Sequence, residues 1–273
     1  MPIGAVTRGT TNTNRLRRVD RFIQTLPVLR RTDDPLVVDL GYGASGVTAF
    51  ELQARLARVR PEVHVRGLEI APERVATATA QLKDVRDGRT PFARDASVDF
   101  AVGGFEVPLP GPASRRAAVI RAFNVLRQYD ESAVAGAWEL MRGRLQSGGM
   151  LVEGTCNEVG RVSSWVTLDP VGPVSFSISL RLTDLEHPSI VAERLPKALI
   201  HRNVPGERIH RLLGDLDRFW QHNAALQTYG PVQRWLATLD ALTASGWSIR
   251  TPQRRRRLGE LTVPWAEVAP AIT

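Results

Sequence analysis

Apolar runs alternate with amphipathic stretches from residue 35 onward. The run Leu36–Leu40 is short and continuous, which is typical of a buried parallel strand. A helix is expected over roughly 46–59, and Val63–Glu69 alternates as a second strand. Pro72 suits the first turn of a second helix that continues over Glu73–Leu82. The pattern predicts repeated βαβ units and therefore a right-handed, largely parallel sheet.

The segment Ala96–Gly103, with the sequence ASVDFAVG, fits either the third or the fourth strand. If it were the fourth strand, Ala113–Tyr129 would become a helix. Only about 30 residues separate Glu69 from Val102, which is too few for a helix, a strand, a helix and another strand. The spacing therefore predicts that Ala96–Gly103 is the third strand and that Ala117–Phe123 is the fourth.

The second half of the chain changes from strands to helices. A helix is expected over 131–145, followed by a strand at Met150–Thr155. Arg161–Asp169 and Val174–Leu182 form a predicted hairpin, and these are the last two strands expected. From Ser189 to Trp247 the pattern is helical, and its apolar stripe is more typical of a core than of a substrate site. The other face carries Arg208, Arg211 and Arg218, which are candidates for lining a cleft.

The pattern divides the chain into three predicted parts. Residues 1–34 form a basic segment with a short helix, 35–183 a cofactor-binding domain, and 184–273 a helical elaboration with a basic tail. In the first part the apolar residues at helical spacing predict a helix packed on the sheet domain. These residues are Leu16, Val19, Ile23 and Leu26.

Composition and charge narrow the class of protein. The chain has 273 residues, of which 43% are hydrophobic, so it is expected to be globular. Its net charge of +8 lies almost entirely at the two ends, including the run Arg254–Arg257. Solvated termini are the favoured interpretation of this charge, and a phosphate-binding surface for nucleic acid is the alternative. The single cysteine, Cys156, and the lack of a membrane-length apolar run favour a cytoplasmic protein.

Glycines follow the first predicted strand at the spacing Gly41-x-Gly43-x-x-Gly46. This spacing fits a nicotinamide or flavin site, an S-adenosylmethionine (SAM) site, or a tight turn alone. Asp39 stands two residues before the glycines, where its charge would repel a pyrophosphate and attract the amino group and sulfonium of SAM. Glu69 ends the second strand and suits ribose hydroxyls in either cofactor. Asp39 therefore favours SAM, and Glu69 does not discriminate.

The stretch Asp39–Gly46 resembles the first motif of class I SAM-dependent methyltransferases, and Val65–Ile70 with Pro72 resembles their second. The resemblance covers about residues 35–155. It implies an α/β fold, with a Rossmann-like seven-stranded, mostly parallel sheet, flanking helices and one antiparallel strand near its end. The sequence adds a helical C-terminal elaboration to this fold.

The resemblance also implies roles for individual residues. Gly41 and Gly43 would pass under the methionine part of SAM, Asp39 would hold its amino group directly or through water, and Glu69 would hold its ribose. Phe105 and Glu106 are expected near the adenine, where a ring face and an acceptor for the exocyclic amine are useful. The expected cofactor-binding residues are Asp39, Gly41, Tyr42, Gly43, Ser45, Glu69, Ile70, Phe105, Glu106, Phe123 and Asn124.

The methyl acceptor is less well defined by the sequence. Asn124 is not followed by the Pro-Pro-aromatic residues of enzymes that methylate base amino groups. Thr155-Cys156 resembles the Thr-Cys of RNA cytosine-C5 methyltransferases, but those carry a second cysteine, so Cys156 is expected to be an ordinary buried residue. Segments at Gly9–Phe22, Arg121–Glu131 and Val152–Gly160 resemble a group of uncharacterised bacterial methyltransferases. A small-molecule acceptor is favoured over nucleic acid.

Several further hypotheses stay open at this stage. Glu106, Glu158 and His201 are candidates for a general base, and nothing in the sequence chooses among them. No histidine pair has ligand spacing, so no metal site is expected. Residues 10–22 are expected to form a lid, or alternatively only to cover a sheet edge; in the lid, Asn14 or Arg18 would touch the acceptor or cofactor. Residues expected beside the acceptor are Tyr42, Asn124, Arg127, Gln128 and Tyr129.

Two other classes compete with a methyltransferase. One is an NAD(P)-dependent Rossmann oxidoreductase that uses the same glycine turn, against which Asp39 argues. The other is a SAM-binding module without catalytic activity, against which the intact Asp39, Gly41, Gly43 and Glu69 argue.

Overall fold

The computed structural model describes residues 2–271 and divides into two compact units. The first contains residues 2–153, 158–160 and 168–172, and the second contains 154–157, 161–167 and 173–271. The domain boundaries expected after residues 34 and 183 stay predictions. By contacts alone, the basic N-terminal segment belongs to the first unit.

The first unit holds part of an eight-stranded sheet, in the order β3-β2-β1-β4-β5, in which the strands from β3 to β4 are parallel. Strand β1 pairs in parallel with β2 and β4, and β2 pairs in parallel with β3. From β1 the chain adds β2 and β3 on one side and β4 on the other. Because these strands are parallel, their carboxyl ends lie at one edge of the sheet, and open α/β sheets bind ligands at the point where the strand order changes side. The strands are β1 (Leu36–Leu40), β2 (His64–Glu69), β3 (Val98–Val102), β4 (Ala117–Phe123) and β5 (Leu145–Cys156).

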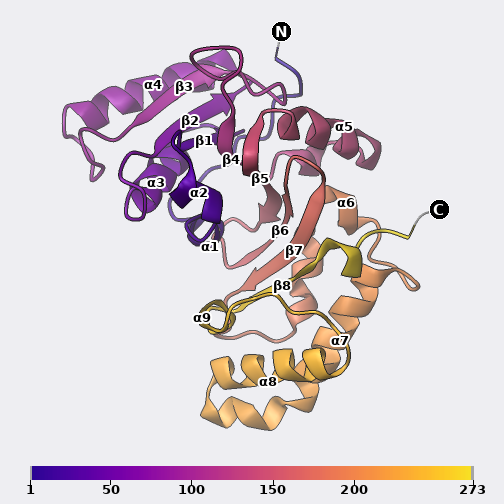
Figure 1. The fold of residues 1–273 in the computed structure, drawn as a ribbon. Coiled ribbons are helices and arrows are strands. Elements are labelled where there is room, and N and C mark those ends of the chain that lie inside the picture. Colours follow the sequence, from indigo (N-terminus) through magenta and orange to yellow (C-terminus); the bar gives the residue numbers. More distant parts are fainter. Residues whose placement is uncertain (1, 272–273) are drawn as a thin grey trace. The chain divides into compact units, whose positions relative to one another are not determined.

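Helices flank this sheet, and α3 and α4 pack beside β2 and β3 (Figure 1). Helix α4 begins at Pro72, as its fixed φ and missing amide hydrogen favour. Helix α1 packs on α3 through the apolar face predicted for it, with Val19 and Ile23 fully buried. The helices of this unit are α1 (Arg17–Ile23), α2 (Pro27–Arg31), α3 (Val47–Leu56), α4 (Pro72–Arg86), η1 (Leu126–Gln128) and α5 (Glu131–Arg142).

The second unit combines the last three strands of an eight-stranded mixed sheet with helices. Its strands follow the last residues of β5 in the order β6-β7-β8, and β7 pairs antiparallel with β8. Only a few residues join β5 to β6 and β6 to β7, and such short connections suit antiparallel neighbours. The strands are β6 (Val162–Leu168), β7 (Pro173–Leu180) and β8 (Glu260–Pro264). The helices are η2 (Pro188–Arg194), α6 (Lys197–Ile200), α7 (Arg208–His222), η3 (Ala224–Tyr229), α8 (Pro231–Ala244), α9 (Gln253–Arg256) and η4 (Trp265–Glu267).

The α/β fold with a Rossmann-like, mostly parallel sheet and flanking helices is confirmed, as is the helical C-terminal part. The predicted strand register is also confirmed, because Ala117–Phe123 is strand β4 with every residue buried and not part of a helix. The expected count of seven strands is wrong, since the described residues contain eight. The eighth strand, β8, lies in the segment expected to be a basic tail.

The basic run beside β8 is partly structural. Arg255 is buried and forms an ion pair with Glu260, whose side chain is 2% exposed. Arg256 donates to the Thr251 carbonyl (2.9 Å) and lies 3.6 Å from Asp240. Solvated termini were the favoured interpretation of this charge, but two of the four arginines in Arg254–Arg257 instead hold the second unit together. In the described part of the chain no helix is both long and apolar enough to cross a membrane.

Candidate functional site

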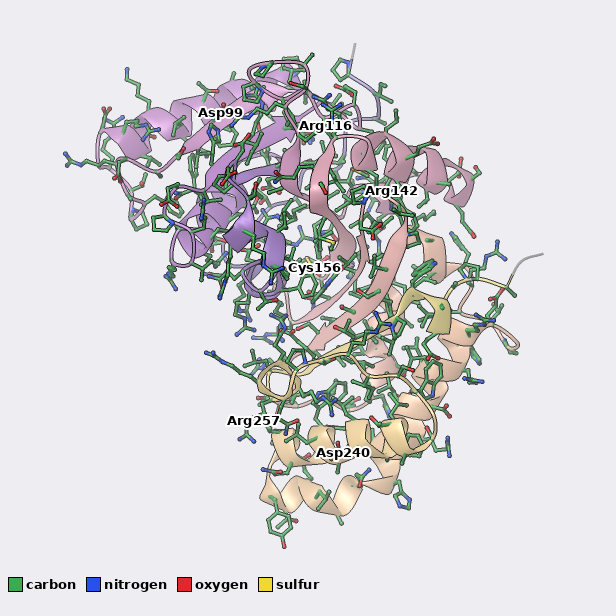
Figure 2. The ribbon with its side chains drawn as sticks, in the orientation of Figure 1. Asp99, Arg116, Arg142, Cys156, Asp240 and Arg257 are labelled. Carbon is green, nitrogen blue, oxygen red and sulfur yellow. The ribbon has the colours of Figure 1, made fainter. Side chains whose placement is uncertain are left out.

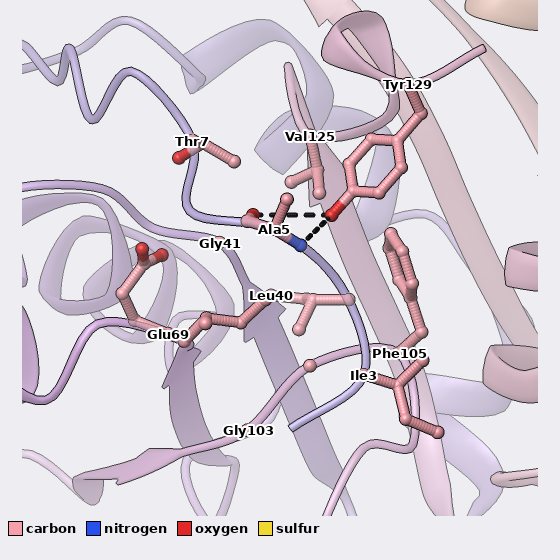
Figure 3. Close-up of a pocket in the computed structure, with 12 residues that line it drawn as sticks. Ile3, Ala5, Thr7, Leu40, Gly41, Glu69, Gly103, Phe105, Val125 and Tyr129 are labelled. Carbon is pink, nitrogen blue, oxygen red and sulfur yellow. Dashed lines mark hydrogen bonds between the residues drawn. The ribbon is translucent and has the colours of Figure 1, made fainter. Parts of the chain in front are cut away.

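A groove lies in the first unit at the carboxyl ends of the parallel strands (Figure 3). It is bounded by the ends of β1 and β2, by the turn after β3, and by the segment that joins β4 to α5. Its lining residues are Ile3, Ala5, Thr7, Leu40, Gly41, Glu69, Ile70, Gly103, Gly104, Phe105, Val125 and Tyr129.

The glycine turn forms the floor of the groove. Gly41 and Gly43 have φ values of 70° and 91°, in the left-handed region that favours glycine. A Cβ at Gly41 would lie 2.5 Å from Cγ2 of Val125, so the turn also needs glycine for close packing. Ser45 accepts a hydrogen bond from the Val47 amide (3.3 Å) at the start of α3. The turn therefore presents backbone rather than side chains to the groove.

Glu69 stands at the end of β2 on one side of the groove, with its side chain 2% exposed. Burial raises the pKa of Glu69, and the Arg74 guanidinium and the Gly43 amide oppose that shift. Arg74 donates to Oε1 of Glu69 (2.8 Å). The carboxylate thus lies at the edge of the groove with one oxygen held by Arg74, and its role toward a ribose stays a prediction.

The turn after β3 supplies the opposite side. Phe105 is buried against Tyr129, with ring centroids 5.2 Å apart. Glu106 accepts from the Gly104 amide (2.9 Å), and Val107 has a φ of 45°. A β-branched residue with positive φ is a backbone outlier, and such strain clusters at functional sites. Phe105 lines the groove from a tightly constrained turn, and Glu106 is the next residue of that turn.

Residues 3–9 lie along this groove and use its hydrogen-bonding groups. The Ile3 amide donates to Oε2 of Glu106 (2.7 Å), and the Phe105 amide donates to the Ile3 carbonyl (2.9 Å). Figure 3 shows the segment passing between Glu69 on one side and Phe105 with Tyr129 on the other. The Tyr129 hydroxyl accepts from the amide of Ala5 and lies 3.3 Å from its carbonyl.

The far end of the segment binds the glycine turn. The Ala44 amide donates to the Gly9 carbonyl (2.9 Å), and a Cβ at Gly43 would lie 2.9 Å from that oxygen. Arg74 donates to the Thr7 carbonyl (2.7 Å), so it connects the segment to Glu69. The cavity that remains is about 10 Å³. That is room for about one water molecule, whereas small-molecule pockets enclose about 300–1,000 Å³.

Asp39 is placed beside the glycine turn but is engaged in a buried ion network. Its Oδ1 accepts from Nε of Arg121 (3.0 Å), and its Oδ2 accepts from Thr48 (2.9 Å) and lies 2.7 Å from Nη2 of Arg121. Arg121 also pairs with Asp20 of α1, and Arg55 pairs with Asp20 (2.5 Å). Burial raises the pKa of Asp20, and Arg121 is the strongest opposing influence.

This network changes what Asp39 contributes. Because Arg121 neutralises its charge, Asp39 does not present a free carboxylate to the groove. Its discrimination between SAM and a pyrophosphate, inferred from the sequence, therefore loses its electrostatic basis. A role of Asp39 toward the cofactor amino group stays a prediction, and it would act through water or after an exchange of partners.

The other predicted cofactor residues lie at or just after the ends of β1, β2 and β4. Ile70 follows β2 and lines the groove, whereas Tyr42 is buried with its ring edge-on to Phe100, at 5.2 Å between centroids. Burial raises the pKa of the Tyr42 hydroxyl. Phe123 ends β4, and Asn124 follows it with a φ of 60°. Their roles toward a cofactor stay predictions.

The residues proposed for the lid lie beside α3. The Asn14 amide donates to both carboxylate oxygens of Glu51 (2.7 and 2.9 Å), and Arg55 donates to the Asn14 side chain (2.6 Å). Arg18 is 6% exposed. The segment that covers the groove is therefore residues 3–9, which precede the predicted lid of 10–22.

Other candidates from the sequence occupy different places. Glu106 borders the groove, Glu158 is exposed in the first unit, and His201 follows α6 in the second. Arg127, Gln128 and Tyr129 follow β4, and the Gln128 side chain accepts from the Arg8 amide (3.2 Å).

The arginines of α7 have partners in their own unit. Arg208 donates to the Ala266 carbonyl (2.6 Å), Arg211 lies over the ring of Trp247, and Arg218 pairs with Asp215 (2.7 Å). Cys156 is fully buried at the end of β5 (Figure 2), as expected for an ordinary core residue. Within residues 2–271, no group of three or more His, Cys, Asp and Glu side chains is arranged to hold a metal.

The sequence interpretation missed Ile3, Gly4, Thr7, Gly9 and Arg74. Residues 3–9 have no hydrophobic period, and their contacts with the groove are mostly made by backbone groups. The one available signal was the pair of glycines, Gly4 and Gly9, which have φ values of 136° and 73°.

The topology defines an α/β protein with a Rossmann-like sheet and a groove at its strand ends. No protein-family model matches the sequence, and no curated protein matches it significantly. Among solved structures, one neighbour is magnesium protoporphyrin IX methyltransferase from Synechocystis PCC 6803 with bound S-adenosylhomocysteine (SAH). It is 15% identical with a TM-score of 0.37, and the match covers 51% of this chain and 55% of that chain.

Another neighbour is the CcbJ methyltransferase from Streptomyces caelestis, which is 18% identical with a TM-score of 0.36. That match covers 63% of this chain and 68% of the neighbour. The mitomycin 7-O-methyltransferase MmcR is also 18% identical, with a TM-score of 0.37 and coverage of 52% and 36%. The chain thus spans about half the length of the first neighbour. What the groove binds is therefore inferred from its own residues.

Proposed function

We propose that the first unit binds SAM in the groove and that the protein transfers the methyl group to a small-molecule acceptor. The observation that carries the proposal is the convergence of three elements at the strand ends. These are the glycine turn at Gly41 and Gly43, the Glu69 carboxylate, and the Phe105-Glu106 turn. A cofactor-binding turn alone is weak, but the three together suit the methionine part, the ribose and the adenine of one ligand.

The groups on the Phe105-Glu106 turn support this assignment. Glu106 offers an acceptor and the Phe105 amide offers a donor, and a backbone amide and carbonyl of Ile3 engage both. Adenine presents the same pair, since its exocyclic amine donates and a ring nitrogen accepts. The residues therefore fit the nucleoside once residues 3–9 leave the groove.

The roles in the reaction follow from these positions. When bound, SAM supplies an electrophilic methyl group on its sulfonium. Glu69 orients the ribose, and the glycine turn lets the backbone approach the methionine part closely. Phe105 covers the adenine and excludes water from it. Glu106 is kept as an adenine ligand rather than as a general base.

Burial of three arginines in the basic termini supports a small-molecule acceptor over nucleic acid, although Arg254 and Arg257 stay exposed. Nucleic-acid binding needs exposed cations that replace counterions along a phosphate backbone. Arg15 and Arg18 are 8% and 6% exposed, and Arg255 is 9% exposed. These arginines are committed inside their units. A cytoplasmic location is part of the proposal.

Calorimetric titration tests the function. SAH is expected to bind the purified protein, and NAD titrated in parallel tests the alternative cofactor. Glu69→Ala should weaken SAH binding by about 1.5–3 kcal/mol, the range for hydrogen bonds to charged groups. Glu73→Ala, which removes an exposed carboxylate from the first turn of α4, is the matched control and should leave the affinity unchanged.

Transfer of labelled methyl from SAM, tried on a metabolite library and on total RNA, tests catalysis. NAD binding in place of SAH would favour the oxidoreductase alternative. SAH binding with no transfer to any acceptor would favour a binding module that does not catalyse.

A further inference from the structure

Residues 3–9 engage the hydrogen-bonding groups of the groove as a ligand would. At one end the Ile3 amide and carbonyl pair with Glu106 and Phe105, and at the other the Gly9 carbonyl accepts from the Ala44 amide. Between them, the Thr7 carbonyl is bound by Arg74. These are the positions assigned above to the adenine, the methionine part and the ribose of SAM.

The fit of the segment depends on glycine at position 4. Gly4 has a φ of 136°, and a Cβ there would lie 2.9 Å from Cδ1 of Ile70 and from the Tyr129 hydroxyl. Phe105 is 3.5 Å away on the other side. Gly4 therefore occupies the slot between Ile70 and Phe105 in which a flat adenine ring would be held.

Polar contacts hold the segment in the groove, and its side chains bury little apolar surface. The apolar residues Ile3 and Val6 are 45% and 54% exposed. Segments with few buried apolar contacts and solvent-exposed backbone hydrogen bonds open at low free-energy cost. The segment can therefore leave the groove without unfolding the sheet beneath it.

We propose that residues 3–9 compete with the cofactor for the groove. This segment must leave the groove before SAM binds. This proposal rests on the proposed function, because it concerns the same groove. The apparent dissociation constant equals the intrinsic constant divided by the fraction of molecules whose groove is open. A segment that is closed in nine-tenths of molecules therefore weakens SAM binding about tenfold.

Affinity for SAH, measured by calorimetry, tests the competition. Gly4→Val is the main variant, because a side chain is strained at this φ and its Cβ would lie 2.9 Å from Ile70 and Tyr129, which disfavours the closed segment. Deletion of residues 2–9 is the second variant, so a failure of one variant to fold does not end the test. Gly111→Val is the matched control, since Gly111 also has a positive φ (89°) but lies outside the groove.

Both variants are expected to bind SAH at least tenfold more tightly than wild type, and Gly111→Val is expected to match wild type. Release is monitored in Val6→Cys carrying a spin label, which is selective because the native Cys156 is buried. Saturating SAH is expected to increase the mobility of the label.

The outcomes separate the two proposals. SAH binding that is equal in all variants, or weaker after removal of the segment, overturns the competitor while the cofactor assignment stands. A label that stays immobile with SAH bound also overturns it. No SAH binding by any variant, including the deletion, overturns the proposed function itself.

Discussion

Glu153 gives the chain a pH-dependent stability that can be calculated from the structure. Its side chain is fully buried in β5, and burial raises its pKa from 4.5 to about 8, an effect that the Trp138 indole only partly opposes. The folded state therefore keeps a proton that the unfolded chain loses above about pH 4.5. The stability from this group is fully present below that pH and is lost as the pH rises through about 8.

The magnitude follows from proton linkage. Each pH unit between the two pKa values costs about 1.4 kcal/mol, so at pH 7 the protonated group lowers the free energy of unfolding by about 3 kcal/mol. Glu153→Gln keeps the shape of the neutral acid and removes the titration. The variant is expected to gain stability over wild type as pH rises, by about 3–4 kcal/mol between pH 5 and pH 8.

Denaturant unfolding at pH 5, 6, 7 and 8 measures this difference. Other titrating groups are common to both proteins and cancel in the comparison. Glu139→Gln, which alters an exposed carboxylate on α5, is the control and should show no such trend. If the difference in the free energy of unfolding between Glu153→Gln and wild type is constant across pH, the reasoning is refuted.

Two further predictions concern buried arginines. Arg121→Met leaves the carboxylates of Asp20 and Asp39 buried without their shared partner, so urea unfolding should show a free energy of unfolding lower by about 3–5 kcal/mol. A decrease of less than 1 kcal/mol would mean that the network is solvated. Arg255→Met should cost a similar amount by removing the ion-pair partner of the buried Glu260, whereas Arg254→Met, at an exposed position of the same run, should change the midpoint very little. Equal effects would show that the run acts only by its charge.

The sequence predicted the parallel sheet because its strands are continuous apolar runs separated by amphipathic helices. Leu36–Leu40 and Ala117–Phe123 were located with their observed boundaries. Strand β8 was missed because it is short and stabilised by pairing with β7, whose sequence lies far away in the chain. Pairing over such a distance leaves no local periodicity in the sequence.

The candidate site was predictable only in part, for a similar reason. The glycine turn and Glu69 have local spacing that indicates their place at strand ends. The engagement of Asp39 by Arg121 depends on the parallel register of β1 and β4, in which these two residues are partners. The filling of the groove by residues 3–9 depends on backbone hydrogen bonds, which side-chain identity does not encode.

The position of Ile3 has a practical consequence for how the protein is purified. Its amide and carbonyl are both bound at the adenine end of the groove, so any affinity tag fused ahead of Pro2 would emerge beside Glu106 and Phe105. A bulky or charged tag there would pull on the segment or cover the opening. Apparent cofactor affinity would then change with the choice of vector. Protein carrying its tag at the other end, or none at all, is the material on which titrations can be compared between laboratories.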